Sequence, residues 1–195
     1  RPLLAAPMRL SASAPVTGET RVEPDGFAQI HWSIMPGDGR QTLDRLVLEI
    51  PLRPEVARYL FTWPTPSSRQ LQADYRSPFQ PIVWLGDEDR GFAWFCESDQ
   101  HWYPADVNRA LTIDREGQQV VLRCHLADGE RPVTKPLTYT FGFQATPVKQ
   151  PEQTVWDYRI THHGNYGLEQ ERAVSGGKIV YGPALEAMRE SVVAK

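Results

Sequence analysis

The chain has 195 residues, enough to bury one sizeable hydrophobic core. Hydrophobic residues make up 41% and charged residues 23%, which is the composition of a globular domain and not of a disordered chain. The net charge of −3 excludes the strongly basic surface typical of nucleic-acid-binding proteins. No apolar run approaches the roughly 18 residues that a membrane helix needs. We therefore expect no nucleic-acid partner and no membrane span.

The 17 prolines are spread along the chain from Pro2 to Pro183. A proline inside a helix costs about 3 kcal/mol, so most of the chain cannot form long helices. This spacing favours strands and turns over a helical bundle or an alternating β/α fold. The predicted fold is all-β, mainly an antiparallel β-sandwich, with short helical segments and a mixed C-terminal tail.

The first predicted strands follow a turn at Pro24–Gly26. Apolar and polar residues alternate over residues 28–34 and again over residues 46–52, the pattern of half-buried strands. Pro51 indicates a strand end or a sheet edge. Pro54 then predicts a short helix, because proline is favourable at the first helical position. An apolar stripe at helical spacing follows, made of Val56, Tyr59, Leu60 and Trp63. We expect this helix to cap one end of the sandwich rather than to bind a ligand.

Further strands are predicted in the middle of the chain. Two apolar runs, residues 82–85 and 91–97, are separated by Gly86–Arg90 and predict a β-hairpin. Residues 120–126 and 137–144 alternate in the same way as the earlier strands. The pattern up to about residue 146 is that of a sandwich.

The sequence changes character after Pro147. Residues 1–150 are predicted to form the sandwich domain, and residues 151–195 a linker and C-terminal extension. Val155–Thr161 predicts one more strand, and Pro183 begins a predicted final helix. That helix runs to Lys195 without a stop signal, so we expect the chain to be a piece of a longer one.

The two cysteines, Cys96 and Cys124, do not form a disulfide scaffold. Buried free thiols are favoured, with one cross-strand disulfide as the alternative. The sequence has no phosphate loop and no histidine pair at zinc spacing, so we expect no metal and no cofactor. The acidic turn Asp87–Asp89 lacks the spacing of a calcium loop and is interpreted as solvated.

The densest polar and aromatic stretch runs from Trp84 to Trp102. Exposed tryptophans beside carboxylates suit sugar recognition, because sugar C–H faces stack on indole while hydroxyls need acceptors. Trp84 and Trp94 are interpreted as core residues, whereas Trp102 leaves both interpretations open. The candidate carbohydrate-binding residues are Trp102, Glu97, Asp99 and His101.

Glu97 and Asp99 also raise the alternative of an acid/base pair. Glycoside hydrolysis uses two carboxyl groups at a defined separation, and residues two apart on a strand share a face. That spacing is common by chance, so no catalytic residue is assigned from it.

The stretch from Trp84 to Trp102 resembles the N-terminal β-sandwich domain of proteins related to glycoside hydrolase family 123. It contains a Trp-Leu-Gly strand end, an acidic turn, an Arg-Gly pair and an aromatic strand leading into Glu97-Ser-Asp99. Residues 141–148 are similar to the strand that closes that domain, and the piece from Pro54 to Leu60 also fits. The resemblance spans roughly residues 25–150.

The resemblance implies a bacterial carbohydrate enzyme that is secreted, periplasmic or on the cell surface. In such proteins the sandwich precedes a catalytic (β/α)₈ barrel of about 250 residues. Residues 151–195 hold at most the start of that barrel, and no catalytic residue of the family carries over. The expected function is a non-catalytic accessory domain that packs against the barrel and shapes its active site. The alternatives are a stand-alone carbohydrate-binding module and a small carboxylate-dependent glycosidase.

Overall fold

A computed structural model describes residues 2–37, 41–64, 69–71 and 74–148, together with three strands near the C-terminus. The chain divides into two compact units, Arg1–Val148 and Lys149–Lys195. In the described part of the chain, regular structure consists of strands and one 3₁₀ turn, η1 (Val107–Arg109). The predicted all-β class is confirmed, whereas no α-helix is present among these residues.

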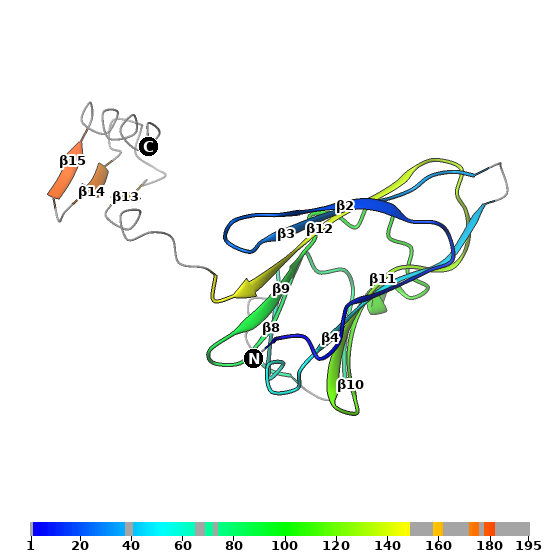
Figure 1. Ribbon diagram of the computed structural model, residues 1–195, viewed down its shortest axis with the longest axis horizontal. Helices are drawn as coiled ribbons and strands as arrows, with labels where there is room; N and C mark the ends of the chain where they lie inside the picture. The colour runs from blue at the N-terminus through cyan, green and yellow to red at the C-terminus, as the bar shows by residue number, and fades with distance from the viewer. Residues whose placement is uncertain are drawn as a thin grey trace. The chain divides into compact units, whose positions relative to one another are not determined.

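The first unit contains two antiparallel sheets (Figure 1). The five-stranded sheet has the order β1-β4-β11-β10-β7, and the seven-stranded sheet has the order β2-β3-β12-β9-β8-β5-β6. The strands are β1 (Arg9–Ala12), β2 (Thr17–Val22), β3 (Ala28–Ile34), β4 (Thr42–Leu52), β5 (Tyr59–Trp63), β6 (Arg69–Gln70), β7 (Asp74–Ser77), β8 (Ile82–Gly86), β9 (Gly91–Phe95), β10 (Leu111–Glu116), β11 (Gln119–Pro132) and β12 (Leu137–Thr146).

The core lies between the two sheets, as the alternating patterns predict. Both sheets contribute side chains to one cluster of buried residues. The long strands β4 and β11 supply mainly aliphatic side chains, and β9 and β12 supply aromatic ones. The buried members from these four strands include Leu46, Leu48, Ile50, Leu52, Val120, Leu122, Cys124, Leu126, Phe92, Trp94, Leu137, Tyr139, Phe141 and Phe143.

The predicted hairpin is confirmed, since β8 and β9 pair antiparallel with Gly86 opposite Gly91. Its second strand ends at Phe95, two residues before the predicted end. Pro51 lies one residue before the end of β4, consistent with the predicted strand end.

The predicted helix after Pro54 is wrong. The amides of Val56 and Ala57 both donate to the carbonyl of Arg53, at 3.0 and 3.1 Å, which makes a single turn. The chain then enters β5, which pairs antiparallel with β8. Residues 59–63 are rich in aromatic and β-branched side chains and alternate in burial, so strand pairing prevails over the helical stripe.

The second unit contains β13 (Tyr158–Thr161), β14 (Arg172–Ser175) and β15 (Lys178–Tyr181), which form an antiparallel three-stranded sheet. The strand predicted over residues 155–161 appears as β13 in its described part. The predicted helix from Pro183 and most of the predicted linker lie outside the described residues.

Candidate functional site

The structure places Trp102 in the core. Its side chain is only 9% exposed. Its ring makes edge-type contacts with Phe79 and Trp94, at centroid distances of 5.2 and 5.9 Å. The indole therefore has no open face on which a sugar ring can stack. Trp102 is part of the aromatic core.

His101 lies in the segment that follows β9 and forms hydrogen bonds with strand β12. Its backbone has a φ of 67°, a left-handed conformation that histidine adopts more readily than most residues. Its Nδ1 lies 3.1 and 3.2 Å from the backbone O and N of Thr138. The Tyr139 hydroxyl donates to the His101 carbonyl at 3.0 Å. These contacts give His101 a structural role.

Glu97 and Asp99 lie beyond the end of β9, so the shared strand face expected for them does not form. Both are exposed. The carbonyl of Asp99 accepts a hydrogen bond from the amide of Trp102 at 2.9 Å, and this closes a turn. Glu97 lines the groove described next, whereas Asp99, His101 and Trp102 are not among the lining residues.

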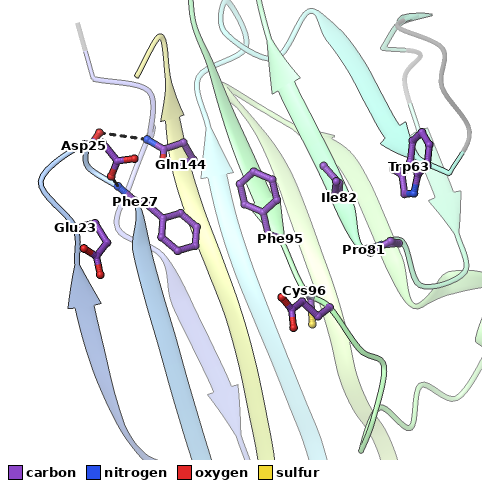
Figure 2. A pocket seen from close by; sticks show the side chains of 10 residues that line it. Glu23, Asp25, Phe27, Trp63, Pro81, Ile82, Phe95, Cys96 and Gln144 are labelled. Carbon is purple, nitrogen blue, oxygen red and sulfur yellow. Dashed lines mark hydrogen bonds between the residues drawn. The ribbon is translucent and has the colours of Figure 1, made fainter. Parts of the chain in front are cut away.

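A groove of about 640 Å³ crosses the outer face of the seven-stranded sheet, the face turned away from the core (Figure 2). Segments far apart in the chain contribute to it: the turn between β2 and β3, the strands β5, β8, β9 and β12, and the residues next to them. The lining residues are Glu23, Asp25, Phe27, Trp63, Pro81, Ile82, Phe95, Cys96, Glu97 and Gln144.

Aromatic rings form much of the groove. Strand register places Trp63, Ile82 and Phe95 in one cross-strand row, and Trp63 is 48% exposed. Phe27 packs beside Phe95, with ring centroids 6.1 Å apart. Figure 2 shows the two rings side by side, with Trp63 at the end of the groove opposite Glu23. A ligand in the groove therefore meets aromatic surface along its length.

Phe27 lies close against the sheet because a glycine faces it. A Cβ atom at Gly142 would come within 2.4 Å of the Phe27 ring. No larger residue at position 142 leaves room for that ring. Because position 142 is a glycine, the Phe27 ring can lie directly on β12. The space above the ring remains part of the groove.

The polar groups of the groove are mostly hydrogen-bond acceptors. Glu23, Asp25 and Glu97 are exposed carboxylates. Asp25 also accepts from the amide of Phe27 at 3.0 Å, which shapes the turn. The Gln144 side chain is nine-tenths buried, and its Nε2 donates to the carbonyls of Asp25 and Ala145, at 3.4 and 3.2 Å. Its Oε1 accepts no hydrogen bond from the described residues.

Aromatic surface continues beyond the groove. Phe61 lies directly opposite Trp84 on the same outer face, and both are half-buried. The Trp84 Nε1 donates to the Thr146 hydroxyl at 3.1 Å. The core interpretation is confirmed for Trp94, which is 1% exposed, and is wrong for Trp84, whose strand parity directs it outward.

The cysteine at the groove is not a nucleophile at neutral pH. Burial raises the pKa of Cys96 to about 11, and its Sγ donates to the carbonyls of Ser98 and Thr140. Burial also raises the pKa of Cys124. Both are free thiols, so the prediction of buried cysteines is confirmed.

A second, smaller hollow of about 260 Å³ lies beside η1 and includes Arg109, His125 and Asp128. His125 stands 3.3 Å from the Thr112 hydroxyl and 4.0 Å from the Asp128 carboxylate. Burial lowers the pKa of His125, which favours the neutral imidazole. The arrangement of Thr112, His125 and Asp128 resembles a catalytic triad. Thr112, however, is only 3% exposed and does not line the hollow.

Within the described ranges, no group of three or more His, Cys, Asp or Glu side chains is placed to hold a metal ion. The part of the chain that the structure describes has no helix long and apolar enough to cross a membrane. No protein-family model matches the chain, and no curated protein matches it either.

The sequence interpretation missed Trp63, Phe27 and Gln144. Trp63 was assigned to a helical stripe, although Tyr59, Phe61 and Trp63 also follow a period of two, which places all three on one strand face. Phe27 and Gln144 are more than 100 residues apart in the sequence, and the pairing of β3 with β12 brings them together. No local sequence pattern therefore indicates either residue.

Proposed function

We propose that the first unit is a carbohydrate-binding sandwich and that the groove over β12, β9, β8 and β5 is its binding site. The observation that carries this proposal is the half-exposed Trp63 in line with Phe95 and Phe27, with carboxylates at the groove. Aromatic rings offer faces for sugar C–H groups, and carboxylates accept hydrogen bonds from sugar hydroxyls.

The wider setting is part of the same proposal. The sandwich is an accessory domain of a larger bacterial glycoside hydrolase, which is secreted, periplasmic or on the cell surface and carries its chemistry in a barrel. The resemblance to family 123 proteins supports this setting. In this setting the groove holds a glycan chain near the enzyme, and the sandwich need not itself hydrolyse it.

The carboxylates at the groove favour binding of a polar ligand over a purely packing role. The row of apolar side chains alone could also pack against a barrel. Glu23, Asp25 and Glu97 are exposed beside that row, and an apolar partner surface would leave them without hydrogen-bond donors.

The predicted Glu97–Asp99 pair gives no support to the small-glycosidase alternative. Hydrolysis needs two carboxyl groups on either side of the scissile bond. Of the expected pair, only Glu97 lines the groove.

The test is to screen the whole chain against a glycan array and to measure the affinity of the best ligand by titration calorimetry. Trp63→Ala should weaken binding about tenfold or more, because a stacking face of about 1–2 kcal/mol is lost. Trp63→Phe should keep part of the affinity.

Val107→Ala is the matched control, since Val107 is exposed on η1 and lies outside the groove. Thermal midpoints of all variants should stay close to that of the parent. The proposal fails if no glycan binds, or if Trp63→Ala binds as tightly as the parent protein.

A further inference from the structure

The described residues that line the groove include acidic side chains and no basic one. The acidic residues are Glu23, Asp25 and Glu97. None of these three carboxylates forms an ion pair with a described residue, whereas other surface carboxylates do. Arg58 pairs with Glu88, and Arg123 pairs with Glu49. Arg21 lies on β2 opposite Gln29 of β3 and is not among the lining residues.

The neutral polar groups of the groove also favour a ligand that donates hydrogen bonds. Gln144 uses its Nε2 to bind two carbonyls, so its Oε1 is the part left to accept a hydrogen bond. Apart from the Trp63 indole N–H, the polar side chains that the described lining residues offer to a ligand are acceptors. A ligand that fits must therefore bring donors.

This charge selects among glycans. An acidic polysaccharide would place its carboxylates or sulfates within a few ångströms of three like charges, which is unfavourable. A neutral glycan supplies donors from its hydroxyl and amide groups but brings no positive charge. A protonated amine supplies both donors and the opposite charge, and the flat face of an amino-sugar ring still stacks on an indole.

We propose that the preferred occupant is an amino-sugar polymer whose amines are not acetylated, such as a glucosamine oligosaccharide. This inference rests on the proposed function. The rings of the glycan lie along Trp63, Phe95 and Phe27. Its ammonium groups approach Glu23, Asp25 and Glu97.

The experiment compares a glucosamine hexamer, its fully N-acetylated counterpart and an oligogalacturonate by calorimetry with the whole chain. The titrations are made at about pH 5, where the weakly basic amines of the glucosamine hexamer are protonated. The glucosamine hexamer should bind about tenfold more tightly than the acetylated one, and the oligogalacturonate should bind most weakly. Raising the salt from about 50 mM to about 500 mM should reduce the preference.

Glu23→Gln and Glu97→Gln keep the shape of the groove and remove charge. Each should reduce the affinity for the unacetylated hexamer several times more than the affinity for the acetylated one, because only the unacetylated hexamer loses a charge-assisted contact. Glu130→Gln is the matched control, because Glu130 is exposed on β11 of the other sheet.

The outcomes separate the two proposals. Equal affinity for the acetylated and unacetylated hexamers, or tighter binding of the acidic one, overturns the charge inference and leaves glycan binding standing. Failure of every glycan on the array removes both.

Discussion

Trp84 illustrates how a single ring depends on the residues beneath it. Its indole lies across the paired glycines at the end of the β8–β9 hairpin. A Cβ at Gly91 would come within 2.4 Å of the indole Nε1, and one at Gly86 within 2.1 Å of the ring. The two glycines are needed here for space, so that the ring can lie low over the sheet.

Gly91→Ala should therefore destabilise the protein by about 1–3 kcal/mol, the usual cost of an extra methyl group in a packed position. The three atoms nearest to this Cβ all belong to Trp84. In a Trp84→Ala background the same substitution should cost almost nothing. A double-mutant cycle from urea unfolding measures this coupling.

Gly86→Ala is the control for that cycle. Its Cβ would also lie 2.7 Å from the carbonyl oxygen of Arg90, a backbone atom that remains when Trp84 is truncated. Removal of the indole should rescue Gly86→Ala only in part. Equal rescue at both positions would show that the indole is not the specific obstacle at Gly91.

At the scale of elements, the outer face of the five-stranded sheet holds a ladder of charges across β4, β11 and β10. Arg123 donates to Glu49 at 2.7 Å, to Asp114 at 3.1 Å and pairs with Glu116 at 2.6 Å. Asp114 also pairs with Arg76 of β7. One guanidinium thus links three carboxylates on neighbouring strands.

Arg123→Met should destabilise the protein by about 1–2 kcal/mol, because it leaves half-buried carboxylates facing one another. Arg58→Met is the control, since its pair with Glu88 is solvent-exposed and should change stability little. If both variants unfold at the same denaturant concentration, the ladder has no special role.

A strand can be predicted from the sequence where burial of one face leaves an alternating pattern of apolar and polar residues. Over residues 46–52 and 120–126 only a period of two fits, and β4 and β11 follow it. Residues 56–63 fit both a helical stripe and strand alternation. Pairing of residues 59–63 with β8 favours the strand over the helix. The periodicity of a single sequence contains no information about which strand will pair with it.

The candidate site was less predictable than the strands. Glu97 was identified because it lies in a dense polar and aromatic stretch. Trp102 has the same local setting, yet it turns into the core against Phe79, a contact that sequence spacing does not indicate. The groove depends on the order β3-β12-β9-β8-β5, which is set by long-range pairing.

At the scale of the whole molecule, the first unit contains its own core and the complete set of described groove residues. A chain that ends at Val148 should therefore fold cooperatively and retain the β-rich circular dichroism spectrum and glycan affinity of the full chain. Calorimetric unfolding of both chains is the measurement. A truncated chain that stays unfolded would show that residues 149–195 are needed for folding.

The strands at the sheet edges also govern how copies of this protein meet one another. β1, β6 and β7 span four, two and four residues, and β2, the longest edge, is exposed at every position and carries Glu19 and Arg21. Short or charged edges are poor templates for a further strand. We therefore expect edge-to-edge strand pairing between copies to be unfavourable, which disfavours fibrillar aggregation at high concentration.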